Sequence, residues 1–207
     1  MELVQPILTL RREGTHVGVI TAVALASVRA YRDHPDLPEW DQWLAGSFTK
    51  SVRSFKADID ILVTRRDETP HSTCAVGHAF AVAYAPHPAD AFPRHIKRAQ
   101  VAGLDRDKPE PATVLPHDGK GLFVVLDSSV GMSTGKAAAQ AAHALFSAHL
   151  LRALPHFRGI DTDRARIVWA HPGLMREIVS DRRATVIKDN GRTEVAPGTV
   201  TAAAISL

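Results

Sequence analysis

The chain of 207 residues lacks several features that define whole classes of protein. Its one cysteine, Cys74, excludes a disulfide within the chain, and its histidines follow no zinc-binding spacing. The opening MELVQPILTLRREG has no basic stretch ahead of a long apolar one, and no apolar run approaches the roughly 20 residues that span a bilayer. We therefore expect a soluble cytoplasmic protein, with no metal site and no membrane partner.

Composition and charge favour a folded domain with one basic half. The hydrophobic fraction of 45% and the charged fraction of 23% are those of an ordered protein. Residues 1–115 hold 14 basic and 14 acidic side chains, whereas residues 116–207 hold 11 and 8, so the whole net charge of +3 lies in the second half. This distribution permits an anionic partner such as nucleic acid.

Both halves alternate predicted strands with predicted helices. In the second half we predict strands over 121–129, 165–170, 184–188 and 199–206, and helices over 134–153 and 174–181. In the first half we predict strands over 6–12, 48–55, 72–77 and 78–86, helices over 17–33, 40–46 and 59–66, and a basic helix within 91–103. The pattern predicts an α/β fold of two small three-layer α/β/α units, each a mixed four-stranded sheet with helices on both faces. The units are 1–102 and 119–207, joined by a linker over 103–118 that is rich in Pro, Asp and Lys.

The stretch GMSTGKAAAQAAHA, which begins at Gly131, opens a helix with unusual polar residues. It is not a nucleotide-binding P-loop, because only three residues separate Gly131 from Gly135, where that motif has four, and Lys136 is followed by alanine instead of Ser or Thr. A serine or threonine cap and the free N–H groups of the first turn instead predict a phosphate or other anion site at Ser133, Thr134 and Gly135. An ordinary capped helix with a solvated lysine is the alternative.

Three polar residues of this helix share one face. Lys136, Gln140 and His143 are spaced i, i+4 and i+7 and fall on a narrow stripe of a helix that is otherwise small and apolar. The alanine face can press closely on a sheet while the stripe lines one edge. His143 fits a structural hydrogen-bonding role as well as that of a catalytic base.

Together, MSTGKAAAQAAHA and IKDNGRTEVAPGTVTAAAIS resemble the type-2 peptidyl-tRNA hydrolase family. The family signature joins GK-x-AAQ-x-x-H-A at a helix start to a D-x-GRT-x-x-x-PG hairpin near the C-terminus, and the resemblance covers about residues 119–207. It implies hydrolysis of the ester between a peptide and the 3′ ribose of tRNA, without metal or cofactor. Peptidyl-tRNA is then the substrate and partner, and no DNA partner is expected.

The resemblance and the chemistry of ester hydrolysis together suggest roles for the motif residues. Asp189 is the candidate to orient or deprotonate water, Lys136 to stabilise the anion or bind a phosphate, and Thr193 or Gln140 to position the reactants. His143 completes the catalytic candidates. The candidates for binding substrate or tRNA are Ser133, Thr134, Gly135, Arg192, Lys188, Arg182, Arg183 and Thr199.

Two departures from the family pattern leave alternatives open. Thr134 stands where the family usually has a further lysine, and LDSS (126–129) where it usually has Arg-x-Asp-Leu. The alternatives are a diverged member that binds RNA or a partner protein without hydrolysis, and an enzyme that acts on a different acyl ester or amide. For the hairpin motif, a tight turn at Asn190-Gly191 is a purely structural explanation.

The first half also looks like a degenerate copy of the second. Aligning Gly18 with Gly135 places Val19, Val23 and Ala26 opposite Lys136, Gln140 and His143, so each polar residue becomes apolar. The family resemblance implies homodimers. We therefore expect a monomer in which the first half takes the place of the second subunit, an internal pseudo-dimer, and not a homodimer. A chance match between two amphipathic helices is the rival explanation.

Overall fold

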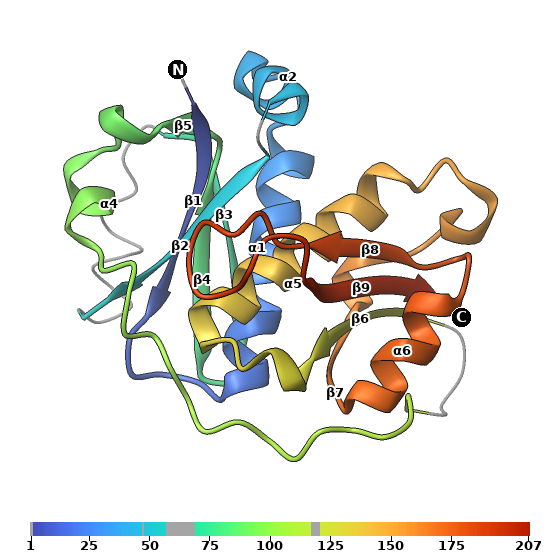
Figure 1. The fold of residues 1–207 in the computed structure, drawn as a ribbon. Coiled ribbons are helices and arrows are strands. Elements are labelled where there is room, and N and C mark those ends of the chain that lie inside the picture. The colour runs from blue at the N-terminus through green and yellow to red at the C-terminus, as the bar shows by residue number, and fades with distance from the viewer. Residues whose placement is uncertain (1, 47, 57–68, 117–120) are drawn as a thin grey trace.

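Two four-stranded mixed sheets organise the chain (Figure 1). The computed structural model describes residues 2–46, 48–56, 69–116 and 121–207, so the helix predicted over 59–66 lies outside the described residues. The first sheet has the order β2 (Thr49–Phe55), β1 (Leu3–Leu10), β4 (Ala79–Tyr84), β3 (His71–Val76), and the short β5 (His87–Pro88) pairs with the start of β1. The second has the order β7 (Arg166–Ala170), β6 (Leu122–Asp127), β9 (Val200–Ser206), β8 (Thr185–Lys188).

The two sheets have the same strand order and the same strand directions. In the first, β1 is parallel to β2 and antiparallel to β4, and β4 is antiparallel to β3. In the second, β6 is parallel to β7 and antiparallel to β9, and β9 is antiparallel to β8. When the four long strands of each sheet are numbered 1 to 4 along the chain, their order across the sheet is 2-1-4-3 in both. The predicted fold of two related α/β units is confirmed.

The long helices α1 (His16–Asp33) and α5 (Thr134–Leu150) pack against each other between the two sheets (Figure 1). On the outer faces lie α4 (Arg94–Arg98) against the first sheet and α6 (Pro172–Ser180) against the second. The tryptophans of α2 (Pro38–Ala45) enter the central core. The connections contain the short 3-10 helices η1 (Ala89–Ala91), η2 (Ser128–Val130), η3 (Pro155–Phe157) and η4 (Thr162–Arg164). No helix in the described ranges is long and apolar enough to cross a membrane.

One hydrophobic core joins the two units. It includes buried side chains from the inner faces of both sheets and from α1, α2 and α5. Alanines line the facing sides of the two helices, and Ala137, Ala138, Ala141 and Ala142 are fully buried. Small side chains allow close approach of helices and strands. The alanine faces therefore let α1 and α5 pack closely against each other and against the two sheets.

The caps of the two helices fix the alignment of the repeat. The Thr15 hydroxyl accepts from the Gly18 N–H at 3.1 Å, and the Ser133 hydroxyl accepts from the Lys136 N–H at 3.2 Å. Equivalent residues are therefore 118 positions apart, and the alignment of Gly18 with Gly135 is wrong by one residue. Buried positions follow the same spacing along both helices, with two exceptions: Leu25 is buried whereas its counterpart His143 is partly exposed, and His149 is buried whereas its counterpart Tyr31 is partly exposed.

The structure adds to the sequence prediction at two places, the basic helix and the linker. The basic helix predicted within 91–103 is helical only over α4, because Pro93 precedes it and Gln100 pairs with Ser54 beyond it. The predicted linker follows the second unit closely. Gly135 donates to the Leu104 carbonyl at 3.1 Å, and Ala112 donates to the Trp169 carbonyl at 2.8 Å.

Candidate active site

The β8–β9 connection is a long loop that closes on itself. At its base the Asp189 N–H donates to the Thr199 carbonyl at 2.8 Å, and the Gly198 N–H donates to the Asp189 carbonyl at 2.7 Å. Gly191 has φ +73°, and a Cβ there would lie 2.7 Å from Pro197 Cδ, so glycine is required. The tight two-residue turn considered for this motif is wrong, since the loop runs from the end of β8 at Lys188 to the start of β9 at Val200.

The carboxylate of Asp189 is the centre of the site. Asp189 is 5% exposed, and its Oδ2 lies 2.5 Å from the ammonium of Lys136. The Gln140 amide donates to the same oxygen at 2.7 Å, and the Gly191 N–H donates to Oδ1 at 2.7 Å. The helix motif and the loop motif therefore meet at one buried carboxylate, which three donors hold in a single orientation.

Two threonines complete this network. The Lys136 ammonium donates to the Thr193 hydroxyl at 2.9 Å. The fully buried Thr201 hydroxyl donates to Gln140 Oε1 at 2.8 Å, which leaves the Gln140 amide nitrogen to donate to Asp189. Sequence reasoning missed Thr201. The pairing of β8 with β9 skips this residue, and an irregularity of that kind can redirect a side chain in a way that strand alternation does not predict.

The start of α5 is satisfied by groups of the chain itself. Glu194 accepts from the Ser133 N–H at 2.9 Å and from the Ser133 hydroxyl at 2.7 Å. Asp105 accepts from the N–H and the hydroxyl of Thr134, both at 3.2 Å. Together with the Gly135 bond to the Leu104 carbonyl, these contacts use the donors predicted for a phosphate. Sequence reasoning missed both carboxylates, and a bound phosphate would have to replace Glu194 or Asp105.

His143 lies two turns further along α5 than Lys136. Its ring packs on Phe48 of the first unit, with 5.1 Å between centroids. Burial, then the nearby Lys50, then Lys136 lower the pKa of His143 well below its usual value, so the imidazole is neutral at physiological pH. No described residue forms a hydrogen bond with this ring. His143 is one of the residues that line the groove described next.

A groove of about 670 Å³ connects these residues. Its floor is α5, one wall is the edge strand β8 with the loop that follows it, and the other wall is the edge strand β2 of the first unit. Arg192, from the loop after β8, reaches the first unit: it contacts the Glu2 carboxylate and lies 3.2 Å from the Thr49 hydroxyl. In Figure 1 the red loop can be followed to the first sheet. The first unit therefore supplies part of the site, which the motifs alone did not indicate.

The candidate tRNA-binding residues lie in two separate places. Lys188 is exposed and lines the groove with Arg192, and Thr199 closes the base of the loop. Arg182 and Arg183 precede β8 and so lie at its opposite end from Asp189. Arg183 is also paired with Asp181, to which it donates at 2.7 Å.

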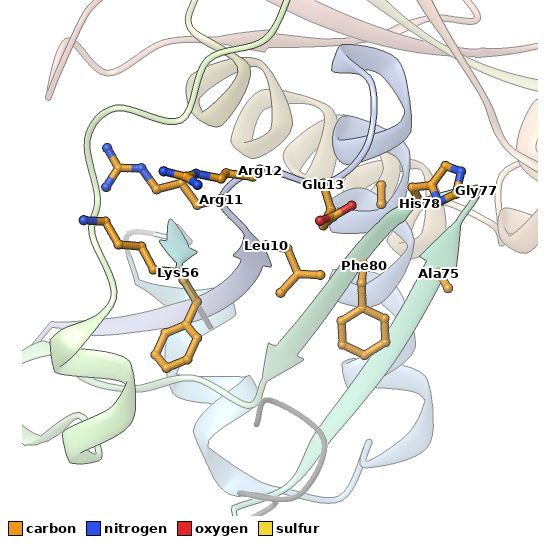
Figure 2. Close-up of a pocket in the computed structure, with 11 residues that line it drawn as sticks. Leu10, Arg11, Arg12, Glu13, Lys56, Ala75, Gly77, His78 and Phe80 are labelled. Carbon is orange, nitrogen blue, oxygen red and sulfur yellow. The ribbon is translucent and has the colours of Figure 1, made fainter. Parts of the chain in front are cut away.

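A second pocket, of about 700 Å³, lies in the first unit (Figure 2). It is formed by the connection after β1, the end of β2 and the β3–β4 turn, and Figure 2 shows Arg11, Arg12 and Lys56 on one side with Glu13 and His78 on the other. This is the same end of the first sheet at which Asp189 stands in the second. The pocket has basic groups but no buried carboxylate held by a lysine and a glutamine.

Comparison with protein-family models and with curated proteins gives no match. No protein-family model matches the chain, and no curated protein is similar enough to it to count as a match. Among the described residues, no group of three or more His, Cys, Asp or Glu side chains could hold a metal ion. The function of this chain is therefore inferred from its own residues and their geometry.

Proposed function

We propose that the chain is a peptidyl-tRNA hydrolase-like esterase that cleaves the ester between a peptide, or an acylated amino acid, and tRNA. The observation that carries the proposal is the buried Asp189 carboxylate, held by Lys136 and Gln140 at the bottom of an open groove. These three residues come from the two sequence motifs that resemble the type-2 family.

In this proposal Asp189 and Lys136 divide the chemistry between them. The carboxylate orients a water molecule and takes its proton as the water oxygen attacks the ester carbonyl. The ammonium of Lys136, fixed by Asp189 and Thr193, stabilises the negative charge that develops on the carbonyl oxygen. The bond to the 3′ oxygen of the ribose then breaks, and that oxygen takes up the proton held by Asp189. The new carboxylic acid of the peptide loses its remaining proton to solvent, so the products are a free peptide carboxylate and tRNA.

Other motif residues hold this pair in place or contact tRNA. Gln140 is a positioning residue, because Thr201 orients its amide and the amide in turn orients Asp189. Lys188 and Arg192 stand at the mouth of the groove, where the phosphates next to the acceptor end of tRNA would lie. We expect the protein to act as a monomer in the cytoplasm, because the first unit already covers the face that a second subunit would occupy.

The test is to incubate the purified chain with peptidyl-tRNA, with no metal added, and to follow release of the peptide. The proposal requires catalytic turnover that depends on the amount of protein. A protein that binds peptidyl-tRNA but does not cleave it would contradict the proposal.

A second candidate function is RNA binding without hydrolysis, or hydrolysis of a different acyl ester or amide. The observation that favours it is the start of α5, where Thr134 is buried and bonded to Asp105 instead of presenting the lysine usual in the family. With Glu194 beside it, the start of α5 carries two carboxylates that would repel a phosphate. Release of the acyl group from a simple amino-acid ester, but not from tRNA, would identify the second possibility.

A further inference from the structure

The groove continues past Asp189 along α5, and its far end is built by α5 and the first unit together. From Lys136 to His143 the helix rises by about 10 Å. An extended side chain of four or five atoms, starting from an ester carbon beside Lys136, covers about 6 Å of that distance. The far end is lined by Phe48, Lys50, His143 and Ser147, two of them from β2 or the residue before it.

Phe48 is held against this part of the groove in a strained conformation. It has φ +52°, in the left-handed region, which residues with a bulky side chain rarely adopt. Its ring contacts the rings of Trp43 and Phe146 as well as that of His143. Strain of this kind persists where the surrounding structure compensates for it, and it is concentrated at functional sites.

Behind Phe48 lies the buried side chain of Lys50, which pairs with no carboxylate of the described residues. Lys50 is 8% exposed and donates to Gln5 Oε1 at 2.8 Å and to the Ser27 hydroxyl at 3.0 Å. Its nitrogen lies 4.2–4.8 Å from three ring centroids: those of Trp43, Phe48 and Phe146. No described carboxylate pairs with it.

Both groups that could carry a positive charge at this end are driven toward their neutral forms. Burial alone lowers the pKa of Lys50 well below its usual value, and burial with the neighbouring lysines lowers that of His143. The cause is general, since the surroundings remove water and no described side chain at this end supplies a negative charge. The faces of the three rings are already in contact with the Lys50 nitrogen. A second ammonium that entered this space would therefore lose its water without compensation, whereas an apolar chain would gain from contact with Phe48.

We propose that the far end of the groove is a pocket for the side chain of the esterified amino acid, which accepts uncharged aliphatic or aromatic side chains and excludes an ammonium. This inference rests on the proposed function for the orientation of the substrate. It adds a specificity that depends on the first unit, which carries neither motif.

The test compares two ligands of nearly equal shape. N-acetyl-norleucine and N-acetyl-lysine are each joined by an amide, in place of the ester, to the 3′ position of 3′-amino-3′-deoxyadenosine, so that neither is cleaved. Their dissociation constants are measured by calorimetry with the full chain at neutral pH. We expect the norleucine ligand to bind at least about tenfold more tightly, because only the lysine ligand brings a charge into the pocket.

Two variants in the pocket and one control variant outside it test where the preference arises. Ser147→Asp places a carboxylate on α5 at the far end, and it should reduce the preference at least threefold by improving binding of the lysine ligand. Ser180→Asp, on an exposed position of α6, is the matched control and should leave the ratio unchanged. Phe48→Ala should weaken binding of the norleucine ligand about tenfold. Equal affinities in the wild type, or a ratio that Ser147→Asp leaves unchanged, would overturn the pocket.

Hydrolysis is measured separately on N-acetyl-norleucyl-tRNA. If the ligands show the expected preference but the ester is not cleaved, the proposed function fails and the pocket stands. If the ester is cleaved but the ligands bind equally, the esterase stands and the pocket fails.

Discussion

Helices α1 and α5 occupy equivalent places in two sheets of the same order, yet only α5 carries a polar stripe. With the caps aligned, Gly18, Ala22 and Leu25 stand where α5 has Lys136, Gln140 and His143. Burial differs at just one of the buried positions of α1: Leu25 is covered, and its counterpart His143 opens to the groove. The comparison separates the residues that make the fold, which recur in both helices, from those that make the site.

The surroundings of the two helices also differ: α5 faces an open groove, whereas the equivalent side of α1 is covered. Over α5, edge strands β2 and β8 leave an open groove. On the equivalent side of α1, Trp169 of β7 packs edge-on against His16 at 4.7 Å, and Asp163 bridges to Arg29 at 2.7 Å. The first unit also replaces the long loop with a short turn at Gly77 and His78. In the proposed function, the second unit carries the site and the first unit supports it.

The largest expected effect comes from separating the two copies. Residues 119–207 expressed alone should not remain a monomer, because the alanine face of α5 and the inner face of the second sheet would be exposed to water. Light scattering after size-exclusion chromatography would measure the molar mass of the fragment. A stable monomeric fragment would show that the first unit is an accessory domain and not a replacement for a subunit.

Moving the lysine between the copies should not move the activity. Lys136→Ala should lower ester hydrolysis roughly 10²–10³-fold with the fold intact, since one preorganised electrostatic contact is lost. Adding Gly18→Lys to this variant should restore nothing, because the β3–β4 turn of the first copy offers no carboxylate. Initial rates on peptidyl-tRNA, with circular dichroism to confirm folding, make the comparison. Recovery of activity in the double variant would mean that both copies contain a working site.

Binding of tRNA should be electrostatic and should depend on the second copy. The net charge lies there, and we predict contacts from Lys136, Arg182, Arg183, Lys188 and Arg192. Each neutralised phosphate contributes about 0.7–0.9 to the slope of log affinity against log salt, so affinity should fall tenfold or more between low and physiological salt. Lys188→Ala should reduce that slope by about one contact, and Lys97→Ala, on α4, should not. A salt-independent affinity would rule out this mode of binding.

The smallest effect is expected at two buried threonines. Thr201→Val removes the hydroxyl that orients Gln140, and we expect hydrolysis to fall roughly three- to tenfold, the equivalent of about 1 kcal/mol. Thr9→Val is the matched change in the first sheet, where the hydroxyl donates to the Phe80 carbonyl at 2.8 Å. It should lower the free energy of unfolding by a similar amount without changing the rate. Equal rates for the two variants would remove Thr201 from the site.

Periodicity and local motifs predict much of this structure, because they depend on neighbours in the chain. The strand and helix alternation, the cap at Ser133 and the stripe on α5 all follow from residues a few positions apart. Thr201, Glu194 and Asp105 could not be found that way. Their contacts depend on an irregular strand pairing and on how the loop and the linker fold back on α5.

The sequence could not predict that Phe48 and Lys50 line the groove, for a related reason. A lysine in a strand is ordinarily exposed, but in β2 Lys50 lies on the same face as the buried Val52 and Ser54. It is buried because β2 is an edge strand that faces α5 of the other unit, and only the packing of the two units shows this.

The most direct test of the central claim is single-turnover hydrolysis of N-acetyl-norleucyl-tRNA by the wild type and by Asp189→Asn. Asparagine keeps the shape of the side chain but cannot take a proton from water. We predict that the wild type releases the acyl group, that Asp189→Asn does so at least a hundredfold more slowly, and that both bind the tRNA with similar affinity. Equal release by the two proteins, or binding without release by the wild type, would contradict the assignment of this loop carboxylate as the centre of an esterase.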